Sequence, residues 1–237
     1  FVPVNEISFL SWACGDDGFM HPHHQGRGYD VKQALCAAFI AAAKVIRSAN
    51  PSALIATAEP LIAVLPVSVE DIAGARGAHE AQYQALDMLL GRRAPWLGGE
   101  ETLIDVIGLN HYPQSQWLHP TRQLPDTPRS LMSLLIECQA RYPHPKFIAE
   151  TGAEGDARVP WFNYVMGEVN QARAAGVDLL STCLYPILNH LGWEDDRYCP
   201  NGLYCGVGAS REVYQPLADA IDRYRTSCGL HQQIYVD

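Results

Sequence analysis

The composition and charge of the chain exclude two classes of protein. Its 237 residues are 48% hydrophobic and 18% charged, which is typical of a single large globular domain. The formal net charge is −9 and no Lys/Arg-rich run occurs, so nucleic-acid binding is disfavoured. No apolar run approaches the roughly 18 residues of a membrane span. No signal peptide is recognised either, and we expect a cytoplasmic protein.

Short apolar segments alternate along the chain with longer segments of helical periodicity. The first apolar segment is FVPVNE at residues 1–6, which we predict to be a strand. After a loop rich in Gly, Asp and His, a helix is predicted with Asp30 as its N-cap and Gln33 three residues later, a capping-box arrangement. The pair Asn50-Pro51 ends this helix. Its expected apolar stripe consists of Ala34, Leu35, Ala38, Ala42 and Ile46.

The rest of the chain repeats this alternation. The remaining predicted strands are ALIATAEP (53–60), LIDVIGLNHYP (103–113), KFIAETG (146–152) and VDLLSTCLYPI (177–187). The remaining predicted helices cover residues 78–91, 127–142, 160–176 and 214–226. Strands that alternate with helices form parallel β-α units, whose strands are buried on both faces and read as continuous apolar runs. No GxGxxG follows any strand, so a dinucleotide-binding sheet is disfavoured.

Polar or aromatic side chains stand at the carboxyl end of every predicted strand. They are Asn5 and Glu6, then Glu59, then Asn110, His111 and Tyr112, then Glu150, then Tyr185 with Asn189. Clustering at the carboxyl ends of successive strands is how a β/α barrel builds its active site. A closed barrel needs eight strands, whereas this sequence offers five. We therefore predict an α/β fold, an incomplete (β/α)8 TIM-type barrel that forms one domain over residues 1–237.

Two groups of possible metal or disulfide residues give weak signals. The seven cysteines include no CxxC pair, so neither a zinc cluster nor a complete disulfide framework is indicated. Cys199 and Cys205 are close enough along the chain to bridge in an oxidising compartment, and this alternative stays open. The HPHH run at 21–24 offers three imidazoles without a matching acidic or cysteine cluster, so a polar loop is favoured over a metal site. We expect no metal and no other cofactor.

Four short patches occur in a defined order and lie at or next to predicted strand ends. They are PVNE, DVIGLNHY, IAETG and LYPILNHLGWEDD. In this order the patches resemble those of family 1 glycoside hydrolases and their relatives in clan A. The resemblance implies that the first segment matches strand four of the family barrel. The chain would then correspond to the carboxyl-terminal five-eighths of a barrel, without strands one to three.

The resemblance implies roles for two glutamates. Glu6 matches the acid/base and Glu150 the nucleophile of a retaining glycosidase. Such enzymes need two carboxyl groups about 5–5.5 Å apart, one ionised to attack the anomeric carbon and one protonated to assist the leaving oxygen. Two carboxylates so close push their pKa values apart, so that one pair serves both roles. The alternative for either residue is a capping or ion-pairing role at a strand end.

Three further residues match positions that order the site. Tyr112 matches the family tyrosine that hydrogen-bonds the nucleophile, and Asn110 matches a polar neighbour of the site. Asn5 matches the asparagine that contacts the sugar 2-hydroxyl, where a bond that strengthens in the transition state contributes to rate. His111 stands where the family has an aromatic residue, and a role in the barrel wall is equally open.

The substrate-binding loop departs from the family pattern. Trp193 matches an aromatic platform for the sugar, but Gly192 stands where the family has a glutamate that grips sugar hydroxyls. Glu194, followed by an aspartate, could substitute with a different side-chain direction. Trp12 could line the cleft or belong to the core. Glu59 reads as a site-wall or hydrogen-bonding residue, with a purely structural role as the alternative.

These residues together lead us to expect a retaining β-glycosidase with β-glucosidase-like activity on small aryl or alkyl β-glycosides. Missing strands leave sheet edges unpaired and apolar surface uncovered, so we expect a homo-oligomer that covers the open edge. The leading alternative is a barrel remnant that binds carbohydrate and turns it over weakly or not at all. A further alternative is a clan A enzyme of other specificity, such as a galactosidase or endo-acting glucanase, whose leading half precedes this sequence.

Overall fold

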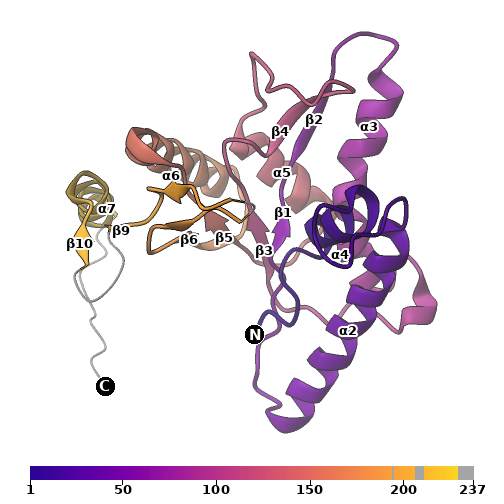
Figure 1. The fold of residues 1–237 in the computed structure, drawn as a ribbon. Helices are drawn as coiled ribbons and strands as arrows, with labels where there is room; N and C mark the ends of the chain where they lie inside the picture. The colour runs from indigo at the N-terminus through magenta and orange to yellow at the C-terminus, as the bar shows by residue number, and fades with distance from the viewer. Residues whose placement is uncertain (194, 206–210, 229–237) are drawn as a thin grey trace.

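A four-stranded parallel sheet forms the centre of the computed structural model, which describes residues 1–193, 195–205 and 211–228 (Figure 1). Its strands stand in the order β1 (Glu59–Pro60), β3 (Ile107–Asn110), β5 (Lys146–Thr151) and β6 (Leu179–Leu184). All three pairings are parallel, as the predicted β-α units require. Within the described residues the sheet does not close, because β1 and β6 stand at its two ends.

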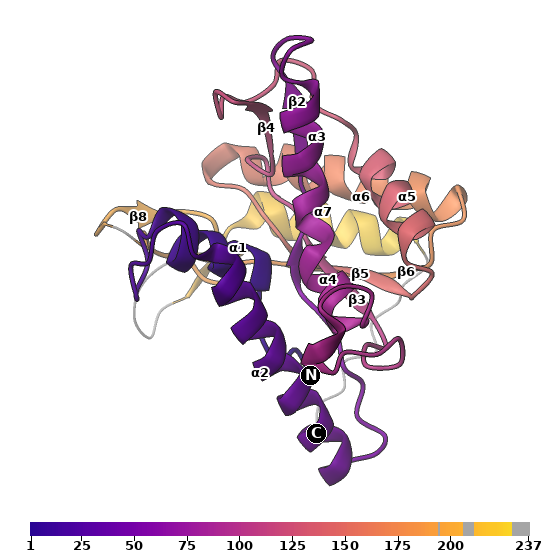
Figure 2. The same ribbon diagram turned by 90° about the vertical axis from the view of Figure 1, so that its right-hand side faces the viewer.

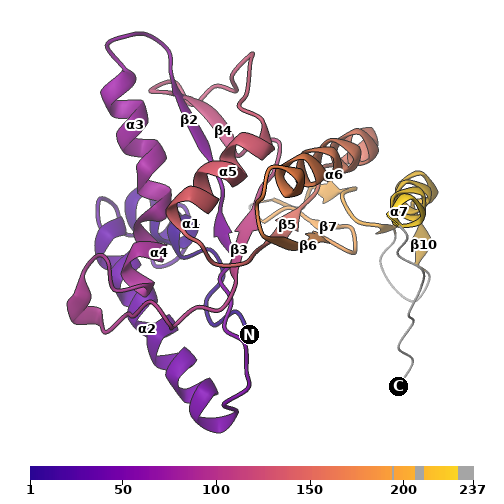
Figure 3. The same cartoon turned by 180° about the vertical axis from the view of Figure 1, so that it is seen from behind.

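Helices follow the strands and cover the sheet. They are α2 (Gly28–Ala49), α3 (Ile72–Glu80), α4 (Gln84–Leu89), α5 (Leu131–Arg141), α6 (Arg158–Ala174) and α7 (Gln215–Ser227). Helix α2 packs against α4, as the side view shows (Figure 2). Helix α5 packs against α6, which in turn contacts α7 (Figure 3). The apolar core lies between these helices and the sheet.

Several short elements lie outside the main sheet. Helix α1 (Ile7–Ser11) runs directly into a π-helical segment, Trp12–Asp17. Strands β2 (Ala63–Pro66) and β4 (Gln116–His119) form a separate parallel pair. Two small antiparallel pairs join β7 (His190–Leu191) to β8 (Tyr198–Cys199) and β9 (Tyr204–Cys205) to β10 (Glu212–Val213).

The segment predicted as the first strand is not a strand. Residues 1–6 run beside residues 54–58 with three backbone hydrogen bonds: Phe1 N to Leu54 O at 2.8 Å, Ala56 N to Phe1 O at 2.8 Å, and Glu6 N to Ala58 O at 2.7 Å. Pro3 lies between these bonds and has no N–H to continue a ladder. The segment therefore extends the sheet edge next to β1 without regular strand pairing.

The predicted N-terminus and apolar stripe of the second helix were also wrong. Helix α2 begins at Gly28 without a side-chain cap, and Asp30 lies inside its first turn, where it pairs with Arg27 at 3.1 Å. The buried residues of α2 are Gly28, Lys32, Cys36, Phe39, Ile40 and Ala43. Of the expected stripe, Ala34 and Ala38 are exposed and the other three are only partly buried. The alanines of α2 occur on several of its faces and so do not mark its buried side. The bulkier Phe39 and Ile40 decide which face packs against the core.

Other helix starts differ from the sequence prediction by a few residues. The helix expected at 78–91 begins earlier, at Ile72, and a 3-10 turn at Ala81–Tyr83 separates α3 from α4. Helix α5 begins at Leu131, where the Ser130 side chain accepts a hydrogen bond from Ser133 N at 3.1 Å. Ser130 is a hydroxyl N-cap, and the helix begins four residues after the predicted start at residue 127.

The described residues include no cross-link, metal cluster or membrane helix. Their seven cysteines are free thiols, so Cys199 and Cys205 do not bridge. No three His, Cys, Asp or Glu side chains of the described ranges gather closely enough to hold a metal ion. No helix in the same ranges is both long and apolar enough to cross a bilayer.

One carboxylate ties three helical segments together below the sheet. Glu137 of α5 accepts hydrogen bonds from His79 at 2.6 Å and Tyr83 at 2.9 Å, and pairs with Arg129 at 2.7 Å. Burial acts to raise the pKa of the Glu137 carboxyl, but the bonds from His79 and Arg129 outweigh it and hold the pKa below its usual value. The charged form of Glu137 therefore stabilises the fold.

We expect Glu137→Gln to lower the free energy of unfolding by about 2 kcal/mol at pH 7, because the charged acceptor of three donors is lost. A depressed folded-state pKa stabilises above the unfolded pKa and loses that contribution as the pH falls. The difference between wild type and variant should therefore shrink below about pH 4. Urea unfolding at pH 7 and pH 3.5 measures it, with Glu100→Gln on the surface as control. A difference that widens in acid would contradict this account.

Candidate active site

Glu6 occupies an unusual backbone conformation at the end of the first segment. Its φ is 49° and its ψ is 55°, in the left-handed region that non-glycine residues rarely adopt. Such a conformation costs on the order of 1–3 kcal/mol and persists only where the surroundings enforce it. Here the Glu6 N–H donates to Ala58 O at 2.7 Å, and helix α1 begins at the next residue. The chain thus turns sharply at Glu6.

Asn110, the last residue of β3, connects Glu6 to the sheet. The side chain of Asn110 is buried and its Nδ2 donates to Glu6 Oε1 at 2.9 Å. Its Oδ1 has no hydrogen-bond partner among the described residues. Asn110 also stands opposite Glu150 in the register of β3 and β5. Asn110 therefore bonds one of the two glutamates through its side chain and stands opposite the other in the sheet register.

A β-bulge on β5 helps to place Glu150. The register runs from Leu109 opposite Ile148 to Asn110 opposite Glu150, so one extra residue of β5, Ala149, is accommodated between the two pairs. Bulges of this kind redirect side chains near active sites. The burial pattern changes phase at the same place, because Ala149 and Glu150 are both partly buried in succession. The bulge thus sets the position of Glu150 opposite Asn110.

Tyr112 orders the Glu150 carboxylate, as the sequence predicts. Tyr112 Oη donates to Glu150 Oε2 at 2.8 Å, which leaves Oε1 without a partner among the described residues. Burial and the negative charge of Glu150 raise the pKa of Tyr112, so its hydroxyl keeps its proton and remains a donor. The unoccupied Oε1 of Glu150 is available to a ligand.

The electrostatics of Glu6 suit a carboxyl group that carries a proton. Burial is the largest cause that raises the pKa of Glu6 to about 7, and the charges of Glu150 and Glu59 add to it. The hydrogen bond from Asn110 acts in the opposite direction and lowers it. Near neutral pH a substantial fraction of Glu6 is protonated. Because Glu150 contributes to the shift, the two carboxyl groups interact electrostatically.

Two residues near the predicted strand ends have structural partners. His111 is buried, its Nδ1 lies 2.8 Å from Leu61 O, and its ring stacks on Trp161 with centroids 5.8 Å apart. Burial lowers the pKa of His111, so it is a neutral wall residue. Glu59 is 1% exposed and its carboxylate accepts the backbone N–H groups of Ile7 at 2.6 Å and Ser8 at 3.1 Å. The hydrogen-bonding role considered for Glu59 is thus observed.

The two predicted substrate-binding aromatic residues, Trp12 and Trp193, are connected through Phe9 of α1 into one row of rings. Trp12 packs on Phe9 with ring centroids 5.8 Å apart, and Phe9 packs edge-to-face on Trp193 at 6.4 Å. Trp193 is 64% exposed, so most of its ring faces solvent. Asn5 is exposed and its side chain makes no hydrogen bond to either glutamate within the described residues, whereas Glu194 lies outside these residues.

A hollow of about 310 Å³ opens beside this row. Its lining residues are Phe9, Phe19, Met20, Gly192, Trp193, Asp195 and Arg197. The sequence analysis did not single out Phe9, although it follows Glu6 by three residues and so lies about one helical turn from it. Phe19 and Met20 gave no signal, because the π-helical segment before them breaks any helical spacing.

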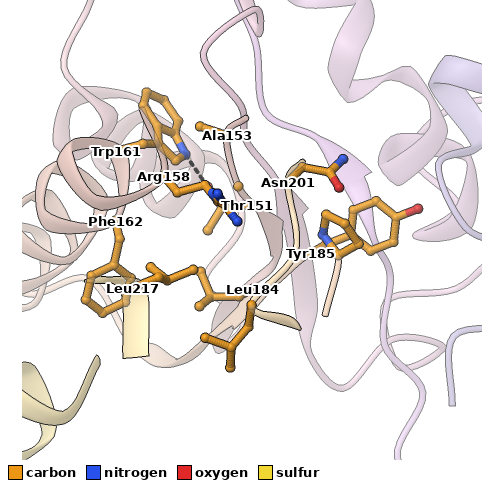
Figure 4. Close-up of a pocket in the computed structure, with 12 residues that line it drawn as sticks. Thr151, Ala153, Arg158, Trp161, Phe162, Leu184, Tyr185, Asn201 and Leu217 are labelled. Atoms are coloured by element: carbon orange, nitrogen blue, oxygen red, sulfur yellow. Dashed lines mark hydrogen bonds between the residues drawn. The ribbon is translucent and has the colours of Figure 1, made fainter. Parts of the chain in front are cut away.

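A second cavity lies behind the site, between β5, β6 and α6 (Figure 4). Its volume is about 10 Å³, enough for no more than one water molecule. Trp161 Nε1 donates to Thr151 Oγ1 at 2.9 Å across this region, which ties the end of β5 to α6. This cavity is therefore a small packing gap, and the hydrogen bond beside it holds the end of β5 next to Glu150.

We expect Asn110→Ala to raise the pKa of Glu6 above its value of about 7, because the hydrogen bond that stabilises the charged form is removed. A ¹³C titration of labelled glutamate side chains follows the Glu6 carboxyl directly. The matched control is Asn189→Ala, which removes another buried asparagine with two hydrogen bonds that do not involve Glu6. A Glu6 midpoint that stays at 7 or falls would refute the assigned role of Asn110.

Comparisons with known proteins identify the architecture. The chain matches the family 1 β-glucosidase of Thermotoga maritima with a TM-score of 0.77 at 17% identity, and the same protein in complex with glucoimidazole with a TM-score of 0.77 at 18% identity. Each match covers 98% of this chain but 64% of the solved chain, so the chain spans less than two thirds of these neighbours. No family model and no curated protein sequence matches the chain. The chain resembles family 1 β-glucosidases in structure and has the fold of an incomplete α/β barrel, as the sequence predicts.

Proposed function

We propose that the chain is a retaining β-glycosidase that acts on small β-glucosides. The observation that carries this proposal is that Asn110 bonds Glu6 through its side-chain amide and stands in register with Glu150 in the sheet. Glu6 has a pKa raised to about 7, and Glu150 is oriented by the Tyr112 hydroxyl. One proton-bearing carboxyl group and one oriented carboxylate are the two groups that a retaining glycosidase needs.

In the first step Glu150 Oε1 attacks the anomeric carbon of the sugar. The bond from that carbon to the leaving oxygen breaks, and the leaving oxygen takes the proton of Glu6 as it departs. Asn110 occupies Oε1 of Glu6, so Oε2 is the oxygen available to hold and deliver the proton. The products are an alcohol and a glycosyl ester on Glu150.

In the second step Glu6, now a carboxylate, takes a proton from water. The water oxygen attacks the anomeric carbon from the side that the alcohol left, and the ester bond to Glu150 breaks. Glu150 returns as a carboxylate and Glu6 is again protonated. Two inversions give a sugar with its original anomeric configuration.

The proposed substrate class rests on the aromatic row and the hollow that begin one helical turn after Glu6. The exposed ring of Trp193 offers a flat apolar face of the kind on which sugar rings stack, and the 310 Å³ hollow beside Phe9 offers room for a small leaving group. The similarity to a β-glucosidase in complex with glucoimidazole supports a β-glucoside as substrate. A bound small carbohydrate is the only partner that this chemistry requires.

A carbohydrate-binding protein with little or no turnover is the second candidate. It is favoured by Gly192, which offers no side chain to grip sugar hydroxyls, and by the high exposure of Trp193. An open, wet site weakens preorganised electrostatics. Saturable binding of glucose or a thioglucoside without hydrolysis between about pH 4 and pH 8 would favour this candidate.

We expect Glu150→Ala to abolish hydrolysis of 4-nitrophenyl β-glucoside, with a loss of at least 1,000-fold in kcat. The reason is that the proposed glycosyl ester forms on the Glu150 carboxylate itself. Release of 4-nitrophenol by wild type and variant measures this. Glu101→Ala is the control, since Glu101 is an exposed carboxylate that pairs with Arg92, and neither residue lines the hollow. Equal rates in wild type and Glu150→Ala would refute the proposed function.

We expect Glu6→Ala to lower kcat by about 100- to 10,000-fold for substrates with poor leaving groups, because protonation of the leaving oxygen is lost. A 2,4-dinitrophenyl glucoside, whose leaving group needs little protonation, should be affected less in the first step. Azide needs no deprotonation and should then speed release of the sugar as a glycosyl azide. In wild type, kcat/KM should fall as the pH rises through about 7, where Glu6 loses its proton. If azide does not speed the Glu6→Ala variant, and its kcat/KM keeps the alkaline limb of the wild type, another group is the acid.

The expected homo-oligomer forms part of the proposal. Strand β6 is an edge of the main sheet, and Leu180 on it is 55% exposed, with Ile187 and Leu191 exposed beyond its end. A long exposed apolar edge favours pairing with another chain. We propose that a second copy covers it.

We expect Leu180→Lys to shift the protein to a smaller species, because a buried lysine at the copy–copy contact is unfavourable. Light scattering coupled to size exclusion at micromolar concentration measures the mass. Val45→Lys on the exposed face of α2 is the control, because it also replaces an exposed apolar residue by lysine. A wild-type protein that is monomeric at these concentrations would contradict the oligomer.

A further inference from the structure

Three consecutive backbone N–H groups at the turn of Glu6 donate hydrogen bonds to two neighbouring residues, Ala58 and Glu59. Glu6 N donates to Ala58 O at 2.7 Å. Ile7 N donates to Glu59 Oε1 at 2.6 Å and Ser8 N to Glu59 Oε2 at 3.1 Å, so both carboxylate oxygens are engaged. Charge-assisted hydrogen bonds of this type are stronger than bonds between neutral groups.

The position of this contact matters because the backbone of Glu6 is strained. Its left-handed conformation needs external restraint, and a five-residue helix such as α1 has little stability of its own. The restraint acts on the two residues that directly follow Glu6. The segment 1–6 supplies only the neighbouring bonds to residues 54–58.

An ion pair does not account for the burial of the Glu59 carboxylate. It is 1% exposed and forms no ion pair with any residue in the described ranges. Burial raises the pKa of Glu59, while the bonds from Ser8 and Ile7 and the charge of Lys32 of α2 act against this shift. The Lys32 ammonium group donates its hydrogen bond to Gln84 at 3.0 Å. A buried carboxylate whose hydrogen bonds go to the backbone beside a reacting group has a geometric role.

We propose that Glu59 is a positioning residue for Glu6. Its carboxylate fixes the backbone of Ile7 and Ser8 so that the Glu6 side chain is held against Asn110 and faces Glu150. The catalytic consequence rests on the proposed glycosidase function, whereas the geometric role does not. Glu59 itself touches no substrate.

Two variants separate the geometry of Glu59 from its charge. Glu59→Gln keeps the length but removes the charge, and its NH2 group faces one of the two backbone donors. Glu59→Asp keeps the charge but is one methylene too short to reach both donors. We expect both to lower kcat by about 10- to 100-fold with KM within about threefold, because a small displacement of a reacting group has this effect.

The pH dependence distinguishes the two variants. Glu6 faces the charges of Glu150 and Glu59, and Glu59 also faces Lys32 and Cys36 of α2. Removal of the negative charge in Glu59→Gln should move the alkaline limb, assigned to Glu6, to lower pH. Glu59→Asp, which keeps the charge, should move it less.

The matched control is Asp105→Asn. Asp105 makes the same kind of contact at the other end of this chain segment, because its Oδ2 accepts Ile55 N at 2.6 Å and pairs with Arg47 at 2.8 Å. Asp105→Asn should lower the thermal midpoint yet leave kcat of the folded fraction and the pH profile unchanged. Equal kinetic losses in Asp105→Asn and the Glu59 variants would reduce Glu59 to a general fold contact and overturn the proposal.

A ¹³C titration of glutamate side chains tests the geometry even without turnover. The Glu6 signal is identified by its absence in Glu6→Gln. We expect its midpoint to fall in Glu59→Gln, and we expect slow amide exchange of Ile7 and Ser8 in the wild type. Unprotected Ile7 and Ser8 amides, or an unchanged Glu6 midpoint together with unchanged kcat, would overturn the proposal. Failure of the glycosidase function would instead appear as equal rates in wild type and Glu150→Ala.

Discussion

The site depends on one buried amide at the end of β3. Asn110 cannot reach water, so its Nδ2 must find an acceptor inside the protein, and Glu6 is that acceptor. The same residue stands in register with Glu150. A short segment that does not pair as a regular strand is thereby attached to the rigid centre of the sheet. If this bond were absent, Glu6 would be fixed through its backbone alone.

Burial then sets the chemical difference between the two glutamates. Glu6 sits in a position where loss of solvent outweighs the hydrogen bond that favours its charged form, so its pKa rises to about 7. Glu150 receives a hydroxyl donor from Tyr112, which orients one oxygen and leaves the other open. Two residues of the same type therefore acquire different environments, which is the arrangement by which enzymes with paired carboxyl groups separate an acid from a nucleophile.

The sequence predicted the parts of the fold and of the site that follow from local pattern. Parallel strands bring their carboxyl ends to one edge of a sheet, which is why Asn110, Tyr112 and Glu150 could be expected together. Pro3 shows the limit of this reasoning, because one missing N–H prevents regular pairing in a segment that otherwise reads as a strand. The alanine-rich helix α2 shows another, since its inner face is chosen by packing.

Long-range contacts were beyond the reach of sequence patterns. Glu59 was recognised as a polar residue at a strand end, but its acceptance of two backbone N–H groups 51 and 52 residues away has no local signature. The hollow beside Trp193 combines residues from α1, the loop after the π-helical segment and the loop around β7. Such a surface exists only once the chain is folded. The two glutamates, Asn110 and Tyr112 could be predicted, whereas the contacts of Glu59 with the backbone after Glu6 could not.

The extra residue in β5 has a consequence for how this protein can change over generations. Regular alternation would send Glu150 to the face that Thr151 now occupies, where Trp161 of α6 packs. The backbone irregularity at Ala149, and not the chemistry of any side chain, thus decides on which face of the sheet the Glu150 side chain lies. A β-branched residue at this position would stiffen the strand toward regular geometry. Selection at a small, chemically inert residue can therefore change the direction of the Glu150 side chain while Glu6, Asn110, Tyr112 and Glu150 are all retained.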